Sequence, residues 1–320
     1  MRREIITWSA ALVLLLSAFA GTVVILNSSL FSASGFVRSY LEAIQRHDAD
    51  GALELAGTEA AGDASSELLV ADAMGDLSDI QLLDDRTDDQ GVHTITYSWT
   101  ADGDAGESQF SVRRQGTSFG LFSTWAFDES PFGVVQVSVS NATAFTANGV
   151  DVVAAAPDQP APYLVFAPGR YEFSHDSRLL HADPLAVTSS TPGAAVIAPV
   201  TVEPTEAFTT QVAAELKDYL DACATQTVLL PTDCPFGQPI SNRIDTTPQW
   251  SIARYPRVVL VRGSEPGTWL MPQTDAAAHL VVEIRSLFDG SVSTFDEDVP
   301  FTSSYVVTIV SDKDLIIAAQ

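Results

Sequence analysis

The stretch FVRSYLEAIQRHDADGALEL, residues Phe36–Leu55, decides the fold of the first folded part of this 320-residue chain. Its apolar side chains recur at the spacing of one helix face: Phe36, Val37, Tyr40, Leu41 and Ile44. The segment from His47 to Gly51 interrupts that spacing, as polar and glycine-containing breaks do at helix ends. The pattern predicts a helix with Ser34 as its N-cap and a second short helix through Leu55, each burying one face against a sheet.

Candidate strands follow these helices. We expect another helix over Ser66–Met74 and then four strands joined by the turn-rich segments DDRTDDQG and ADGDAG. The expected strands are Asp79–Leu83, Val92–Thr100, Glu107–Arg114 and Ser118–Phe127. Helices followed by an antiparallel sheet make an α+β domain, which we place at residues 34–129.

The opening stretch also resembles the NTF2-like (cystatin-like, cone-shaped) superfamily, in particular its small versions on bacterial extracytoplasmic proteins. The resemblance covers Ser34–Phe127 and lies in the element order and in the pattern F-x-x-x-Y-L-x-A-I-x-x-x-D-x-x-x-A-L-x-L. It implies a curved sheet around a helix, often with an apolar pocket where some members use an Asp/His or Asp/Tyr pair. Here His93 and Tyr97 alternate in one expected strand, but no acid matches a catalytic motif, so no site residue is transferred.

From residue 130 to residue 204 the composition changes to Val, Ala, Pro and Gly, without helical spacing. The segment VVQVSVSNATAFTANGVDVVAA reads as strand, turn and strand, and Pro168-Gly169 marks a further tight turn. These features predict a small all-β, sandwich-like module over residues 130–204. Its A-P-G-x-Y-x-F turn resembles modules of the PEGA type, which implies a spacer or wall-binding unit of a bacterial envelope protein.

A further helix opens the last part of the chain, residues 205–320, with Thr205 or Thr209 as candidate cap. Its apolar stripe consists of Phe208, Val212, Leu216, Tyr219, Leu220 and Cys223. The expected strands are Thr247–Ile252, Arg257–Arg262, His279–Phe288, Ser291–Asp296, Tyr305–Ile309 and Leu315–Ala318, with a hairpin turn at Asp289-Gly290. Because SYLEAI at 39–44 and DYLDAC at 218–223 share a core, we interpret this part as a second, diverged NTF2-like α+β domain.

Cys223 and Cys234 are the two cysteines of the chain, with ten residues between them. A structural zinc site needs four ligands at close spacing, and no histidine lies within forty residues of Cys234. An isolated pair in an exported domain is typical of a disulfide, which would stabilise this loop by about 3 kcal/mol. Free thiols, an intermolecular bridge and a redox-sensitive link are the alternatives.

The stretch Ile5–Leu26 contains no charged residue and, as a helix, would span about 33 Å, slightly more than a hydrocarbon core of about 30 Å. Arg2 and Arg3 precede it, so the positive-inside rule places Met1 in the cytoplasm and the remaining chain outside. We therefore expect residues 1–33 to be a cytoplasmic stub and transmembrane anchor. The rival interpretation is a signal peptide cleaved after Ala20.

The formal net charge is −25, from 41 acidic and 16 basic residues. This charge makes nucleic acid an unfavourable partner and disfavours docking on anionic headgroups, so the anchor is the one expected membrane contact. The preference for Arg over Lys and the alanine-rich segments suggest a high-GC bacterial genome, and the chain resembles membrane-anchored envelope proteins of the actinobacterial type. Asn27-Ser28-Ser29 and Asn141-Ala142-Thr143 then match glycosylation sequons by chance.

Motifs of catalysis, cofactor binding and metal binding are missing from the sequence. The histidines lack metal-ligand spacing: His47, His93, His175, His181 and His279. The segment HDSRLLHAD at 175–183 and the acidic turns are interpreted as solvated loops. No cofactor, metal site or catalytic residue is predicted.

The sequence thus predicts a non-catalytic, extracytoplasmic binding or scaffold protein, with an envelope protein or a wall polymer as partner. One alternative is an NTF2-like enzyme acting in a pocket on an apolar or cell-wall-derived small molecule, with His93 and Tyr97 as candidate groups. Another is pairing of an exposed edge strand of the middle module with a second envelope protein.

Overall fold

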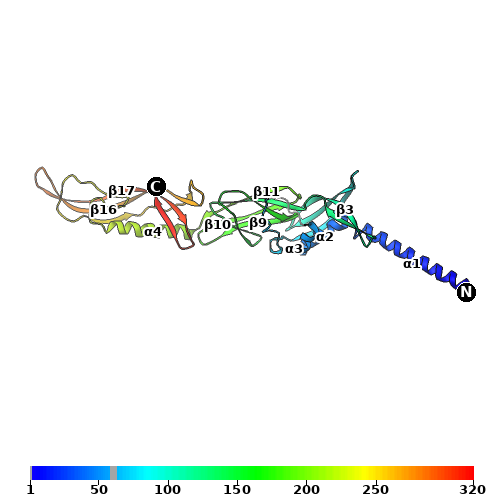
Figure 1. Ribbon diagram of the computed structural model, residues 1–320. Coiled ribbons are helices and arrows are strands. Elements are labelled where there is room, and N and C mark those ends of the chain that lie inside the picture. The colour runs from blue at the N-terminus through cyan, green and yellow to red at the C-terminus, as the bar shows by residue number, and fades with distance from the viewer. Residues whose placement is uncertain (1, 58–62) are drawn as a thin grey trace.

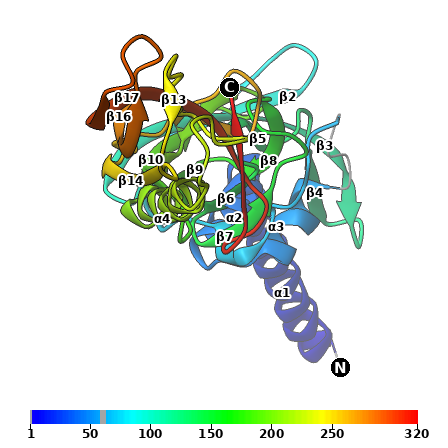
Figure 2. The same ribbon diagram turned by 90° about the vertical axis from the view of Figure 1, so that its left-hand side faces the viewer.

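The computed structural model describes residues 2–57 and 63–320, and it gives no placement for Met1, the predicted cytoplasmic end. The molecule is elongated, and its elements follow one long axis from an N-terminal helix to a long β-hairpin (Figure 1). Seen along this axis, the successive parts lie one behind another (Figure 2). The fold is α+β with antiparallel pairing in nearly every sheet, in agreement with the predicted class.

Helix α1 (Arg2–Ser28) covers the whole apolar stretch and protrudes from one end of the molecule (Figure 1). Taken one at a time, none of the described helices is long and apolar enough to cross a bilayer. A pair bent by 59°, Leu12–Ser28 with Ala33–Gln45, has the required length and composition.

The first folded part contains two helices, a 3₁₀ turn and a four-stranded antiparallel meander. Its elements are α2 (Ala33–Gln45), α3 (Ala49–Ala56), η1 (Ala71–Ala73), β1 (Leu77–Thr87), β2 (Val92–Ala101), β3 (Asp104–Ser118) and β4 (Phe122–Phe127). The predicted stripe packs onto the sheet, and Tyr40 meets Phe110 and Phe127 with ring centroids 6.0 and 5.1 Å away. The N-cap of α2 is Ser32, which accepts the N–H of Gly35; the prediction of Ser34 was wrong by half a turn.

The helix predicted over Ser66–Met74 does not form, and only η1 is helical there. The chain instead crosses to the middle part, where the Ser65 N–H donates to Pro162 O at 2.9 Å and the Leu164 N–H donates to Ser65 O at 2.8 Å. These bonds to a distant strand compete with the local helix, and they explain why local propensity misled the prediction.

The middle part is a sandwich of two sheets, of order β12-β10-β9-β6-β7 and β11-β5-β8. Its strands are β5 (Phe132–Ser140), β6 (Ala144–Ala147), β7 (Val150–Val153), β8 (Ala161–Phe166), β9 (Gly169–Asp176), β10 (Leu180–Ser189), β11 (Ala195–Thr201) and β12 (Glu203–Pro204). Strands β5 and β11 pair in parallel. Val137, Phe145 and Phe173 are buried between the sheets, as alternating inward side chains of a sandwich are.

The last part packs α4 (Glu206–Ala224) against a six-stranded sheet. Its strands are β13 (Arg243–Ile244), β14 (Gln249–Arg254), β15 (Val261–Arg262), β16 (Thr268–Arg285), β17 (Val292–Ile309) and β18 (Leu315–Ala319). Thr205 is the N-cap, as predicted, and it accepts the Phe208 N–H. Tyr219, placed in the predicted stripe, is instead 37% exposed, while its neighbour Leu220 is fully buried.

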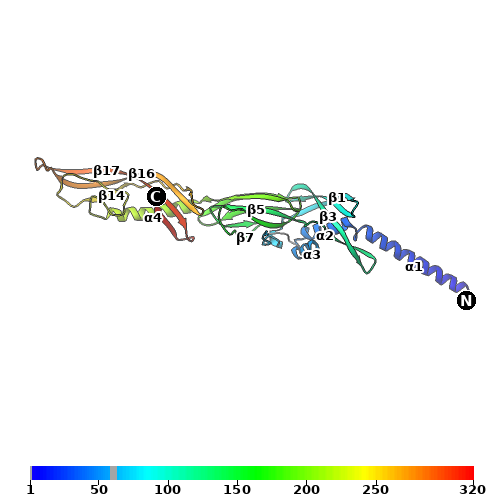
Figure 3. The same ribbon diagram turned by 45° about the horizontal axis from the view of Figure 1, so that its top comes forward.

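The predicted strands Thr247–Ile252 and Leu315–Ala318 correspond to β14 and β18, and only the end of Arg257–Arg262 is a strand, β15. The other three, His279–Phe288, Ser291–Asp296 and Tyr305–Ile309, are in fact parts of two strands of 18 residues each, β16 and β17, paired over almost their whole length. Both long strands contain a proline. Pro300 lies where β17 has β16 as a neighbour on one side only, and Pro272 lies in a register shift between Met271 and Thr274. Edges and bulges are the places where a sheet accepts a residue without an N–H. The resulting hairpin is about 60 Å long and forms the far end of the molecule (Figure 3).

Candidate functional site

His93 and Tyr97 do not form an acid/base pair. The Tyr97 hydroxyl is buried and donates to the Ser34 carbonyl at 3.0 Å, and burial raises the pKa of Tyr97 to about 12. A phenol with this pKa stays protonated at neutral pH and is no base. His93 instead contacts the Asp85 carboxylate at 2.8 Å and meets the Trp125 ring edge-on, in an open hollow of about 750 Å³ that Tyr97 does not line.

The other histidines and acids form local contacts. The His175 ring bonds to the Ala144 carbonyl oxygen at 2.8 Å and to the Ser177 hydroxyl at 3.1 Å, which orders the loop after β9. His181 faces the carboxylates of Asp176 and Asp183 at 3.7 and 3.4 Å on the surface. Among residues 2–57 and 63–320, no group of three His, Cys, Asp or Glu side chains is placed to hold a metal ion.

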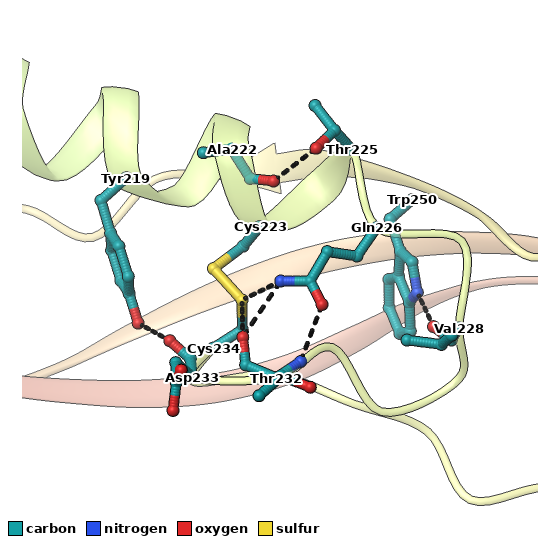
Figure 4. The surroundings of a disulfide bond; sticks show 10 residues. All are labelled: Tyr219, Ala222, Cys223, Thr225, Gln226, Val228, Thr232, Asp233, Cys234 and Trp250. Carbon is teal, nitrogen blue, oxygen red and sulfur yellow. Dashed lines mark hydrogen bonds between the residues drawn. A yellow bond between two sulfur atoms is a disulfide. The ribbon is translucent and has the colours of Figure 1, made fainter.

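Cys223 and Cys234 lie at bonding distance, with their sulfur atoms 2.04 Å and their Cα atoms 5.8 Å apart (Figure 4). The pair joins the last turn of α4 to the loop that leads toward the sheet. Cys223 is buried on the packed face of the helix. The cysteines therefore tie this loop to the core.

Side chains inside the loop reinforce this tie. The Gln226 amide donates to Thr232 O at 3.0 Å and accepts from Thr232 N at 2.8 Å (Figure 4). The Trp250 indole N–H donates to Val228 O at 2.8 Å, and its ring lies 5.1 Å from that of Phe236. These contacts pack the loop beside the disulfide, while Cys234 also lines an open hollow of about 420 Å³ together with Tyr219 and Tyr305.

The strongest polar features lie at the junctions between parts, and an asparagine side chain bridges each one. At the first junction, the Asn27 amide at the end of α1 donates to Leu121 O at 2.7 Å and accepts from Ser123 N at 2.9 Å. The Trp125 indole N–H donates to Phe31 O at 2.8 Å close by. Helix α1 is thus held to the β3–β4 hairpin by directional bonds to backbone groups.

Asn148, in the β6–β7 turn, bridges the first part and the middle part. Its amide donates to Ala73 O at 2.9 Å and to Arg170 O at 3.1 Å, and it accepts from Glu172 N at 2.8 Å. Arg170 also reaches across the junction to the Asp104 carboxylate at 3.2 Å. The two parts share apolar contacts as well, since Phe132, Leu164 and Phe166 of the sandwich belong to the core of the first part.

Asn141, just after β5, bridges the middle and last parts. Its amide donates to Thr268 O at 2.6 Å and accepts from Gly267 N at 3.0 Å, and the residue is buried. The Arg178 side chain of the sandwich bonds to Gln211 and to the Asp312 carbonyl of the last part. One hydrophobic cluster runs through both parts without interruption. With both junctions of the middle part bonded and packed in this way, relative motion of the three folded parts would have to break a core.

Both ends of the long axis carry exposed apolar residues in hairpin tips. Phe119, in the β3–β4 tip beside α1, is 92% exposed, and Leu121 is also exposed. At the opposite end, in the β16–β17 tip, Phe288 is 98% exposed and Leu287 is also exposed. In each tip a large aromatic side chain and a leucine are exposed close together, which makes the two tips candidate contact surfaces.

Sequence patterns do not indicate the bridging role of these asparagines. Asn27 directly follows the apolar run and Asn148 precedes a glycine, but neither context indicates a bond to a distant backbone. The asparagines of both sequons, Asn27 and Asn141, have their amides engaged in these bridges.

The chain matched no protein-family model, no curated protein and no solved structure in the three comparisons made. The NTF2-like and PEGA-type resemblances therefore depend on the sequence patterns and the element order alone.

Proposed function

We propose that this protein is a non-catalytic, single-pass membrane-anchored binding or scaffold element of a bacterial cell envelope, with its N-terminus in the cytoplasm and its folded parts outside. The observation that carries the proposal is the rigid, single-axis build. A helix with the uncharged apolar run Ile5–Leu26 lies at one end, three bonded junctions follow, and a hairpin tip with the exposed residues Leu287 and Phe288 lies at the other end (Figures 1 and 3). Such a body holds a binding surface at a fixed height above the membrane.

The anchor part of the proposal is supported by the composition and surroundings of α1. The 22 residues Ile5–Leu26 carry no charge. The large apolar side chains described along the helix are exposed: Trp8, Leu12, Val13, Leu14, Leu15, Leu16, Phe19, Val24 and Ile25. In water this surface would carry a large hydrophobic penalty, and a bilayer removes it.

The folds of the individual parts enter the proposal as assignments. An α2–α3 pair before the meander β1–β4 supports an NTF2-like first domain, and α4 before the last sheet supports a second one. The small two-sheet sandwich supports a PEGA-like spacer between them. In this assignment the partner is an envelope protein or a wall polymer, and it binds toward the distal end.

The enzyme alternative has less support. The interior of the first domain is filled by aromatic side chains, including Tyr40, Phe110 and Tyr97. The hollow beside His93 is open to solvent and lies outside this interior. Edge-strand pairing of the sandwich is favoured by one feature, the exposed Val153 on the edge strand β7.

The test is protease shaving of intact cells that produce the protein, followed by fractionation and mass determination of the N-terminal fragment. We expect shaving to release the folded parts and to leave a membrane-bound fragment that begins at Met1. A protein that is protected in intact cells, or one found free in the medium and beginning at Gly21, would refute the anchored, outward-facing arrangement.

A further inference from the structure

The β3–β4 hairpin extends beyond its sheet as a two-stranded finger, residues 114–125. Strand β2 pairs with β3 only as far as Arg113, and the register of the finger joins Arg114 to Trp125 and Ser118 to Phe122. A two-stranded hairpin without a packed face is marginal in water. The finger therefore needs a further contact to stay ordered along its length.

Part of that contact is α1. Asn27 donates to Leu121 O and accepts from the Ser123 N–H. Just after α1, the Phe31 ring lies with its centroid 4.5 Å from that of Phe122. These contacts secure one side of the finger. At the tip, Phe119 is 92% exposed and the Leu121 side chain is 42% exposed.

The position of Asn27 indicates the depth of the hairpin tip relative to the bilayer. Asn27 is the first polar residue after the uncharged run Ile5–Leu26, so in a membrane it lies where hydrocarbon gives way to headgroups. Leu121 is bonded to it and lies at the same level. The β3–β4 hairpin reaches alongside the C-terminal end of α1, where this helix joins the folded parts, in two views (Figures 1 and 3).

The charge of the finger differs from that of the chain. No Asp or Glu occurs from Ser108 to Phe127, although the protein carries −25 overall. The acidic β1–β2 turn, with Asp88 and Asp89, lies next to Arg113 of β3, because Val92 pairs with Arg113. Arg113 is five residues, or about 17 Å, away from Ser118 at the end of the finger. The finger is rich in Phe, Trp, Arg, Ser and Thr and contains no acidic residue. This composition suits the interface between lipid headgroups and hydrocarbon.

We propose that the finger is a second membrane contact, in which Phe119 and Leu121 enter the interfacial layer of the bilayer that α1 crosses. The inference rests on the proposed anchoring by α1. Because the molecule then touches the membrane at two points, these two contacts set the tilt of its long axis relative to the membrane. We call the elongated folded parts the rod. The expectation that the anchor alone touches lipid is thereby replaced.

The experiment uses the full chain in nanodiscs of phosphatidylcholine and phosphatidylglycerol, with an environment-sensitive fluorophore on single introduced cysteines. The test position is Phe119→Cys. Its matched control is Phe288→Cys, because both residues are exposed aromatic groups in hairpin tips, at opposite ends of the molecule. Leu16→Cys in α1 reports on the anchor itself. Both native cysteines are joined to each other, so the introduced thiol is the one that reacts.

We expect nitroxide-bearing lipids to quench the label at position 119 and to blue-shift its emission, while the label at position 288 keeps the spectrum of an aqueous probe. Leu121→Cys should behave like Phe119→Cys, which guards against a local defect of one variant. Quenching at position 16 with none at positions 119 and 121 would overturn the finger contact and leave the anchor intact. No quenching at position 16 would overturn the anchor, and the finger proposal with it. A label at 119 shielded from aqueous iodide but untouched by lipid nitroxide would show a protein partner and would also overturn it.

Discussion

Removing the link between Cys223 and Cys234 tests how the parts of the rod cooperate. The double change Cys223→Ser and Cys234→Ser opens a loop with a sequence separation of 11, which corresponds to about 3 kcal/mol in the chain-entropy account. The size of the resulting change in Tm depends on how much of the chain unfolds together, because the unfolding entropy grows by about 2.1 cal/mol/K per residue.

Two outcomes can be separated. If residues 205–320 unfold alone, their entropy of about 240 cal/mol/K turns 3 kcal/mol into a loss of about 12 °C. If the whole chain unfolds as one unit, the same free energy lowers Tm by about 4–5 °C. The hydrophobic cluster shared by the middle and last parts argues for a shift nearer the smaller value.

The assay is differential scanning calorimetry of the full chain in nanodiscs, with the single change Cys223→Ser and the reduced wild-type protein as controls. Reduction should reproduce the shift of the double variant, because it opens the same loop and leaves the sulfur atoms in place. An unchanged Tm, or two thiols that react in the native protein without reductant, would refute the structural role of the link.

Three further predictions concern single side chains. Asn148→Gly keeps a residue that tolerates the positive φ of this turn and removes three side-chain hydrogen bonds at the second junction. We expect the free energy of unfolding to fall by roughly 1–3 kcal/mol and the Glu172 amide to exchange faster. Unchanged exchange at Glu172 would contradict the bridge. Asn27→Ala should raise exchange at Ser123 by about tenfold, for about 1.4 kcal/mol of lost bonding, whereas Asn27→Asp should retain the bond from Ser123 N. Burial raises the pKa of Tyr97 to about 12, so the folded state keeps this proton to a higher pH than the unfolded state does. The free energy of unfolding therefore falls as pH rises from about 10 to 12. Tyr97→Phe should reduce this pH dependence in denaturant titrations, and an identical dependence would contradict the assignment.

The sequence was sufficient for elements whose pattern is local. The stripes of α2 and α4 and the cap at Thr205 follow from spacing and residue type over a few turns. The sequence was insufficient where pairing with distant strands determines the local structure. The segment after Ser65 binds the sandwich instead of forming a helix, and Pro300 lies inside a strand because that strand has a free side there.

The bridging asparagines could not be predicted from the sequence for a related reason. An asparagine that bridges two parts bonds to backbone groups, and backbone groups have no residue identity that a pattern could show. The exposure of Phe119 was equally hidden, because an aromatic residue in a strand-like segment is usually part of a core. The cysteine pair was accessible because both of its members are visible in the sequence and lie close together.

The distribution of charge along the rod acts in the same direction as the proposed finger contact. No acidic residue occurs from Ile5 to Leu41 or in the finger, so in the proposed arrangement the negative charge of the folded parts begins beyond the level of the membrane surface. An anionic leaflet repels this charge over a Debye length of about 8–10 Å at physiological salt. Repulsion therefore acts on any part of the rod that leans toward the surface and spares the finger. In the proposed arrangement, charge repulsion keeps the elongated molecule away from the lipid, the finger sets its tilt, and the β16–β17 tip is presented at a distance from the membrane.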